Sequence, residues 1–90
     1  MTAIEPDMKL DLRGSEALAE ALRARRGADV TINLARVVQF GAHAAQTLLA
    51  AHRSWEADRH AFVLEAPSAA VEEALRILDL DNEPPFSGEI

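Results

Sequence analysis

The sequence predicts a small α/β domain, in which a mixed sheet of about three or four strands is packed against helices. Short segments of alternating apolar and polar residues are each followed by a longer segment with helical periodicity, from one end of the chain to the other. Strands that alternate with helices imply right-handed crossover connections and a sheet that is at least partly parallel. The length of 90 residues suits one domain.

Three segments have the pattern of strands. Met8–Leu12 (M-K-L-D-L) and Val30–Leu34 (V-T-I-N-L) alternate between apolar and polar residues, which is the period of a half-buried strand. Phe62–Glu65 is a third, shorter strand. Ala35–Gly41 is expected to be a connection, with Gly41 as a turn residue before the next helix.

The first helix is expected to begin at Ser15, because Gly14 and Ser15 interrupt the strand pattern and serine is a good N-cap. It is expected to run to about Arg26 and to end at Gly27, since glycine readily adopts the left-handed conformation that follows a helix. Its core residues, Leu18 and Leu22, have helical spacing.

The second helix is expected to run from Ala42 to about Ala57, and the third to begin after Ser68 as its N-cap. The apolar residues of both helices recur at helical spacing and are expected to face the core. They are Ala45, Leu48, Leu49, His52 or Ala51, and Trp55 in the second helix, and Val71, Ala74 or Leu75, and Leu78 in the third.

The domain is expected to span residues 1–80. Residues 81–90 (D-N-E-P-P-F-S-G-E-I) are acidic, contain adjacent prolines and have few core residues. We therefore expect them to form a poorly ordered acidic tail.

The composition argues against several classes of function. A net charge of −6 is unfavourable for nucleic-acid binding, and the cluster of Arg23, Arg25 and Arg26 lies where cations suit a helix dipole. No apolar run approaches the roughly 20 residues of a spanning helix, so membrane insertion is not expected. The chain has no cysteine, which excludes disulfides and thiol catalysis and fits a cytoplasmic location.

Metal and cofactor sites are not expected. His43, His52 and His60 are the candidate metal ligands, but only His52 and Glu56 are spaced to share a helix face, and one such pair is half a site. The sequence also lacks a glycine-rich phosphate loop and a G-x-S-x-G motif. We therefore expect a protein that is not an enzyme.

Several short motifs occur in a characteristic order. A strand ends in N-L-A-R-V (Asn33–Val37), an apolar Phe40 follows, and G-A-H-A-A-Q-T-L-L (Gly41–Leu49) opens the long helix. Later, a strand leads into A-P-S (Ala66–Ser68) and then into a helix that ends in L-x-L (Leu78–Leu80). Together these motifs resemble the STAS family, the fold of bacterial anti-sigma factor antagonists.

The resemblance extends from about Met8 to Leu80 and implies a regulatory domain that binds an anti-sigma factor or another kinase-like protein. In the family, the loop before the long helix and the first half of that helix dock on the partner. Carried over to this chain, the predicted partner-binding residues are Phe40, Gly41, Ala42, His43, Gln46 and Thr47.

The chain departs from the family at the residues that carry regulation. Asn33 stands where the family has Asp, and G-A-H-A at residues 41–44 stands where it has Asp-Ser-Ser-Gly. The second serine of that motif is phosphorylated by the partner kinase in the family's antagonists, and its position falls on His43. No serine or threonine lies between Asn33 and Gln46, so we expect binding that is constitutive or switched by the partner.

Alternatives stay open at this point. The start is short, with one strand where antagonists have a hairpin, and shortened STAS domains also serve chemotaxis histidine kinases and lipid-transport ATPases. His43 could act in phosphotransfer, although no Asp or Glu between Val30 and Thr47 could orient it. Phe40 could end a strand inside the core, and Gln46 could be an ordinary surface residue. The sequence does not indicate the oligomeric state.

Overall fold

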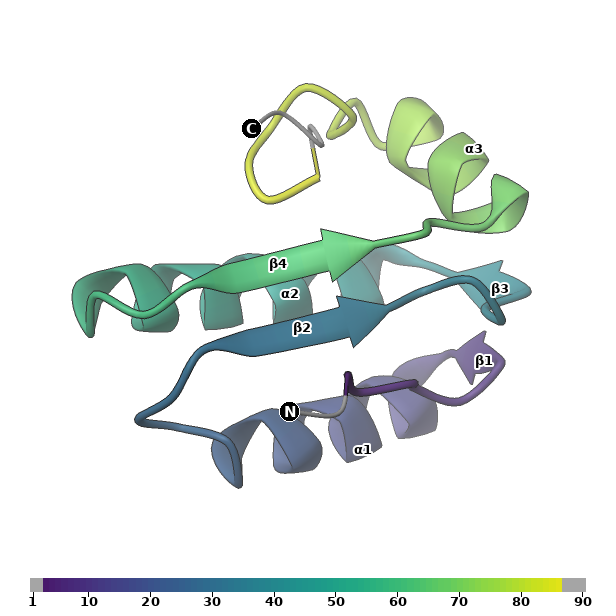
Figure 1. The fold of residues 1–90 in the computed structure, drawn as a ribbon. Coiled ribbons are helices and arrows are strands. Elements are labelled where there is room, and N and C mark those ends of the chain that lie inside the picture. Colours follow the sequence, from purple (N-terminus) through teal and green to yellow (C-terminus); the bar gives the residue numbers. More distant parts are fainter. Residues whose placement is uncertain (1–2, 87–90) are drawn as a thin grey trace.

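The structure, a computed structural model, describes residues 3–86 (Figure 1). Within these residues, the elements in chain order are β1 (Lys9–Leu10), α1 (Leu12–Arg23), β2 (Val30–Asn33), β3 (Gln39–Phe40), α2 (Ala42–Ala57), β4 (Phe62–Glu65) and α3 (Ala69–Ile77). The small α/β fold predicted from the sequence is confirmed. The bounds of α2 and β4 also agree with the prediction, whereas β3 lies inside the segment expected to be a connection.

The described strands pair in parallel and form two small sheets, β1–β3 and β2–β4, rather than one mixed sheet. The chain before β1 adds a bridge, because Ile4 pairs in parallel with Ile32 and its N–H donates to the Thr31 carbonyl at 2.8 Å. Further along, the N–H of Val38 donates to the Met8 carbonyl at 2.7 Å. Residues 4–10 therefore run alongside residues 31–40 and connect the two sheets.

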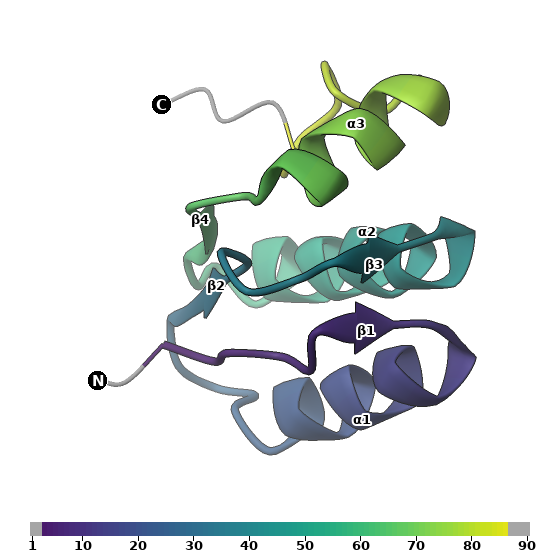
Figure 2. The ribbon, with the colours of Figure 1, turned by 90° about the vertical axis from the view of Figure 1, so that its right-hand side faces the viewer.

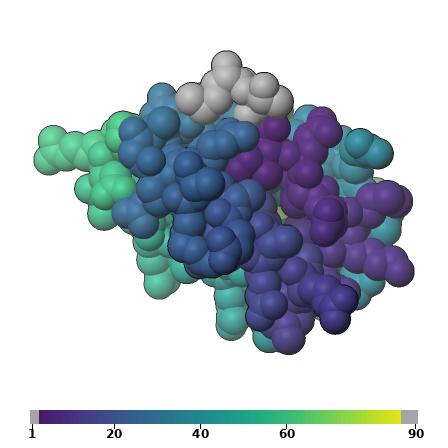
Figure 3. Space-filling view, turned by 90° about the horizontal axis from the view of Figure 1, so that it is seen from below, coloured from purple at the N-terminus to yellow at the C-terminus, as the bar shows by residue number. Residues whose placement is uncertain are grey.

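Two helices cover one face of the β2–β4 sheet. Figures 1 and 2 show α1 and α2 side by side behind the strands, while α3 lies beyond the end of β4 and contacts β3. Seen from below, α1 covers much of the surface, and atoms in the teal of α2 lie next to it at the bottom of the view (Figure 3). The outer surface of this helix layer is therefore shared by α1 and α2.

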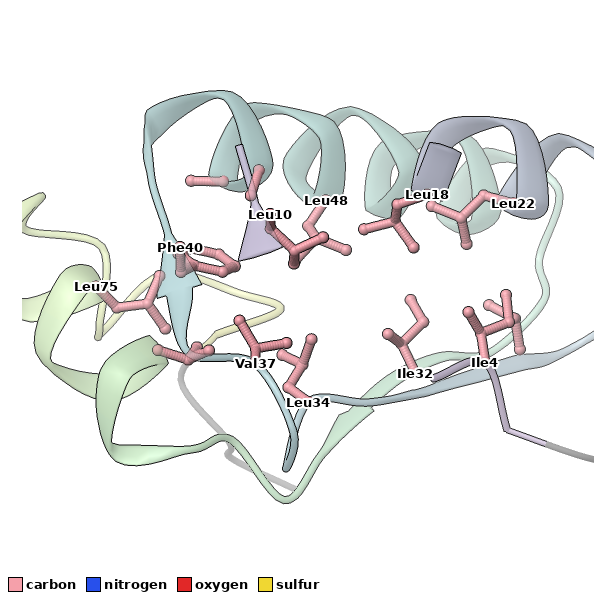
Figure 4. Packing of buried hydrophobic residues seen from close by; sticks show 14 of the residues in the cluster. Ile4, Leu10, Leu18, Leu22, Ile32, Leu34, Val37, Phe40, Leu48 and Leu75 are labelled. Carbon is pink, nitrogen blue, oxygen red and sulfur yellow. The ribbon is translucent and has the colours of Figure 1, made fainter. Parts of the chain in front are cut away.

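A single core fills the space between the sheet and the helices (Figure 4). Leu18 and Leu22 of α1 face Ile4 and Ile32, as their helical spacing predicted. From α2, the buried residues are Ala44, Ala45, Leu48 and Trp55; from α3, they are Val71 and Leu75. The expectation that Leu78 faces the core is wrong, because it is the C-cap of α3 and is 36% exposed.

The start of α1 differs from the prediction. Asp11, not Ser15, is the N-cap, and its Oδ1 accepts a hydrogen bond from the Gly14 N–H at 2.9 Å. Aspartate caps a helix as well as serine does, but the alternating pattern of Met8–Leu12 concealed it. Gly14 and Ser15 therefore lie within α1, and the strand before it shortens to β1.

The end of α1 also comes earlier than predicted, at Arg23 rather than at about Arg26. Gly27 does adopt a left-handed conformation, with φ of 93°, but further along the turn. Arg26 therefore lies after the helix, where its side chain donates to Asp58 Oδ2 at 2.8 Å and lies 5.5 Å from the centre of the Trp55 ring. This turn thus ties the end of α1 to the end of α2.

Residues 81–86 form turns that return to the core. The Glu83 N–H donates to the Leu80 carbonyl, the Phe86 N–H donates to the Glu83 carbonyl, and the Phe86 ring lies edge-on to Phe40 with 6.5 Å between centroids. The domain boundary at residue 80 stays a prediction. The remainder of the predicted tail, residues 87–90, lies outside the described residues.

We predict that Gly14→Ala destabilises the domain. A β-carbon at Gly14 would clash with the carbonyl oxygen of Lys9, so the start of α1 would have to move away from β1. The expected loss in free energy of unfolding is about 1–3 kcal/mol, measured by urea denaturation.

Gly41→Ala is the matched control for this substitution. Its added β-carbon would meet no atom within 4 Å, and the φ of −129° suits any residue. We expect a smaller change, within about 1 kcal/mol, because alanine is a poorer N-cap than glycine but restricts the unfolded chain. Equal stability of the two variants would contradict the close approach of α1 to β1.

Candidate functional site

The segment between β2 and α2, which includes β3, is held by side-chain hydrogen bonds at its start and just before β3. Asn33 accepts a hydrogen bond at Oδ1 from the Ala35 N–H at 2.9 Å, which forms an Asx turn at the end of β2. An amide oxygen accepts this bond as a carboxylate does, which explains how Asn33 can replace the Asp of the family's pattern. Further along, the Val37 carbonyl accepts a hydrogen bond from Ser68 Oγ at 2.6 Å.

The loop leads into the first turn of α2. Gly41 is the N-cap and has no side chain to accept a hydrogen bond, and the first intrahelical bond runs from the Ala45 N–H to the Gly41 carbonyl. The N–H groups before Ala45 therefore have no partner within the helix. Ala42 and His43, both exposed, form this turn and are surrounded by uncapped N–H groups.

The predicted partner-binding residues do not all lie on the surface. Phe40 is only 8% exposed, and its ring packs in the core beside Phe86. His43 and Gln46 are exposed on α2. Thr47 is half-buried and donates from Oγ1 to the His43 carbonyl at 2.9 Å, so its hydroxyl is bound to its own helix.

Three of these residues share a hollow with the first half of α1, and we call it the α1–α2 hollow. It has a volume of about 320 Å³. Its lining residues are Leu12, Ser15, Glu16 and Ala19 from α1 and His43, Gln46, Thr47 and Ala50 from α2. The structure thus brings His43, Gln46 and Thr47 together, whereas Phe40, Gly41 and Ala42 lie outside this lining.

The α1 side of the hollow was missed by the sequence analysis. Leu12, assigned to a strand, is instead the first residue of α1 and is 55% exposed at the hollow. Asp11 was the signal that could have identified it, because aspartate is a good N-cap. Leu12 has no large apolar residue three or four positions later, so a helix that begins there need not bury it. Together with Ala19 and Ala50 of the same lining, Leu12 gives the hollow an apolar surface.

The polar groups of the hollow offer little for catalysis. The hydroxyls of Ser15 and Thr47 both donate to backbone carbonyls, those of Leu10 and His43. Glu16 lies in the same hollow as His43, but within residues 3–86 no hydrogen bond or ion pair joins the two side chains. The arrangement presents an apolar surface with polar side chains around it, which suits binding.

The histidines lie in separate environments. His52 stacks edge-on against Phe62, with 5.8 Å between centroids, and His60 lies with its Nδ1 3.5 Å from Asp29 Oδ1. Among the described residues, no three His, Asp or Glu side chains gather closely enough to hold a metal ion.

A larger hollow of about 620 Å³ lies at the start of the chain and contains none of the predicted site residues. It is lined by Glu5, Pro6, Asp7, Met8, Lys9, Asp11, Arg13, Gly14, Arg36 and Val38. Charges of both signs alternate around it, and the ion pair between Arg36 and Glu5, at 3.8 Å, is exposed. The larger volume therefore does not coincide with the surface that the family resemblance indicates.

Comparison with known proteins identifies the family. A family model described as "Mlab, STAS domain" matches residues 7–87, which is more than half of the chain. This chain belongs to the STAS family. Neither the curated proteins nor the solved structures gave a match to it.

The resemblance read from the motifs is therefore confirmed, and the family match extends beyond residue 80 into the segment that contains Phe86. STAS domains are generally regulatory modules that interact with protein partners. None of the helices within residues 3–86 of this STAS domain has the length and hydropathy of a membrane-spanning segment.

We predict that Ser68→Ala destabilises this STAS domain by about 1–2 kcal/mol, measured by urea or thermal denaturation. Ser68 Oγ accepts a hydrogen bond from the Val71 N–H at 3.2 Å and donates to the Val37 carbonyl, so the substitution removes both the cap of α3 and a tie to the loop. Ser54→Ala, on α2 with no side-chain hydrogen bond, is the control and should change stability by less than about 0.5 kcal/mol. Equal effects of the two substitutions would show that the Ser68 bonds contribute nothing.

Proposed function

We propose that this STAS domain is a non-enzymatic regulatory module of the cytoplasm that binds a kinase-like protein of the anti-sigma type. The partner docks on the first turns of α1 and α2, around the α1–α2 hollow. The observation that carries the proposal is the placement of exposed His43 and Gln46 beside exposed Leu12 at one hollow.

The chemistry of this surface suits a protein partner. Leu12 is 55% exposed, so a partner can bury about half of a leucine, whose complete burial contributes roughly 1.5–3 kcal/mol. His43 and Gln46 are exposed and can exchange hydrogen bonds with a partner at the rim of such an apolar contact. The uncapped N–H groups at the start of α2 add further donors, which a carbonyl or carboxylate of the partner can accept.

Regulation by serine phosphorylation does not fit this surface. The position of the family's phosphorylated serine is occupied by His43, and the nearest hydroxyl in the sequence belongs to Thr47, which donates within its own helix. Binding is therefore constitutive, or it is switched by a change in the partner.

Two kinds of alternative follow from the same surface. The partner could instead be a chemotaxis histidine kinase or a lipid-transport ATPase, and identification of the bound protein distinguishes them. In the other alternative, His43 carries a phosphoryl group. The sequence analysis did not place a carboxylate near His43, but Glu16 lines the same hollow; no hydrogen bond or ion pair joins the two side chains.

We predict that His43→Asp abolishes capture of a kinase-like partner from native cytoplasm. The substitution places a carboxylate in the docking surface, where a negative charge opposes burial against the partner. The measurement is an affinity pull-down with the wild-type protein and the variant, followed by identification of the bound proteins by mass spectrometry. Leu12→Ser should weaken the same capture, because it removes the apolar contact of the hollow.

Ala69→Asp is the matched control for His43→Asp. It places a carboxylate in the first turn of α3, at a position that is also exposed and where the helix dipole also favours a negative charge. We expect it to capture the partner as the wild type does. Capture that is equal for all of these variants would show that docking uses another face of the domain.

We further predict that the purified partner and ATP produce no acid-stable phosphorylation of this domain. Mass spectrometry with and without brief acid treatment measures this, because phosphohistidine is lost in acid and phosphoserine is retained. An acid-stable phosphate accompanied by release of the partner would contradict constitutive binding. An acid-labile phosphate that disappears in His43→Gln would instead support the phosphotransfer alternative.

A further inference from the structure

The α1–α2 hollow is one end of a longer groove. A second hollow, of about 390 Å³, is lined by Ala19, Leu22, Arg23, Arg26, Thr47, Ala50, Ala51, Ser54 and Trp55. Ala19, Thr47 and Ala50 line both hollows, so the two are continuous between α1 and α2. We call the combined feature the α1–α2 groove.

The groove follows the helix axes. At one end, Glu16 of α1 lies across from His43 of α2, and at the other end Leu22 lies across from Trp55. The two helices are therefore parallel neighbours with their N-termini at the same end. At 1.5 Å per residue, the 12 residues of α1 and the 16 residues of α2 extend about 18 Å and about 24 Å. A groove of this length matches about three turns of a third helix.

The middle of the groove has small side chains. Ala19, Ala50 and Ala51 lie there, and Ala50 is exposed. Large side chains that project from a third helix at i, i+3 or i+4 and i+7 can fill the space above such residues, which is how ridges pack into grooves. The shape of the groove therefore suits the apolar face of an amphipathic helix.

The charges of the groove differ between its ends. Glu16 lies at the end near the N-termini of α1 and α2, and Arg23 and Arg26 lie at the opposite end. Arg23 forms an ion pair with Glu20, and Arg26 forms one with Asp58. All four side chains are exposed to solvent. An exposed i, i+3 ion pair contributes little, so the Arg23 guanidinium can turn to acidic groups of a bound segment. Arg26 is held by two hydrogen bonds to Asp58 and by the Trp55 ring, and it can attract such groups from that position.

The charge pattern also selects a direction. A helix with acidic residues at its own N-terminus and basic residues at its C-terminus is favoured by its dipole. Its acidic end meets Arg23 and Arg26 only if it runs antiparallel to α1 and α2. This direction also opposes its dipole to the parallel dipoles of those two helices, which is the favourable arrangement.

We propose that the partner of this domain inserts an amphipathic helix into the α1–α2 groove, antiparallel to α1 and α2, with acidic side chains in its first turn against Arg23 and Arg26. This inference rests on the proposed function, since the His43 end of the groove is the docking surface described above. It goes further in naming the kind of segment that is bound, its direction and its charge.

The test uses a synthetic helical peptide of about four turns as the probe. It has glutamates in its first turn, leucines at i, i+3, i+4 and i+7, and arginines in its last turn; the comparison peptide has the two charged turns exchanged. Binding is followed by the fluorescence anisotropy of a dye attached to the peptide, because Trp55, the only tryptophan of the chain, is almost fully buried beneath the groove. We expect a saturable change with the first peptide and weaker binding of the second.

Two substitutions test the geometry. Ala50→Arg fills the groove and should weaken binding of the first peptide by more than about tenfold. Arg23→Glu should weaken the first peptide by about threefold and strengthen the charge-exchanged one, since an exposed ion pair is replaced by repulsion. Ala57→Arg is the control, because this exposed residue of α2 does not line the groove and arginine suits the end of a helix. No saturable signal, or equal affinity of Ala50→Arg and Ala57→Arg, would overturn the inference.

The natural partner separates this inference from the proposed function. Loss of the captured kinase-like protein with both Ala50→Arg and His43→Asp supports the inserted helix. If the partner is lost with His43→Asp but retained with Ala50→Arg, the proposed docking surface holds and the helix in the groove is wrong. If both variants retain the partner, both the docking surface and the groove are wrong.

Discussion

The rest of this structure depends on the burial of one face of the short β2–β4 sheet beneath α1 and α2. A parallel pair of four-residue strands cannot form a stable sheet alone, because it has too few hydrogen bonds and too much apolar surface. Val30 and Ile32 are almost fully buried under Leu18, Leu22 and Leu48, which supply the missing packing. Because each helix returns along parallel strands, α1 and α2 themselves lie parallel and adjacent, and the proposed docking surface is formed where they meet.

Small residues decide how closely these elements approach. Gly14 lets α1 begin directly against the Lys9 carbonyl, and this places Leu12 beside the first turn of α2 instead of in a strand. Alanines along the facing sides of the two helices keep the outer surface between them open as a groove. These alanines make the helix layer thin. They also leave a surface on which, as proposed above, another helix can lie.

The docking surface proposed above suits binding more than switching. The family's acidic and hydroxyl residues are absent from the loop, and Asn33 keeps the Asx turn without a charge. The hydroxyls that do line the hollow, those of Ser15 and Thr47, stabilise backbone carbonyls. In the proposed docking surface, His43 stands where the family resemblance expects the phosphorylated serine, and the Ser15 hydroxyl of the hollow is buried and bound to the Leu10 carbonyl.

The sequence by itself determined the α/β class, the family, the extent of α2 and β4, the Ser68 cap and the principal core residues of the helices. These follow from local periodicity and from motifs, which are properties of adjacent residues. Only the tertiary structure decided that β3 pairs with β1, that Asp11 starts α1, that Phe40 is buried and that Leu12 joins His43 at one hollow. The Asp11 cap is local, but the alternating pattern of Met8–Leu12 concealed it; the others depend on contacts between segments far apart in the chain. Strand pairing through Ile4 and the close approach of α1 to β1 select conformations that local propensity alone does not decide.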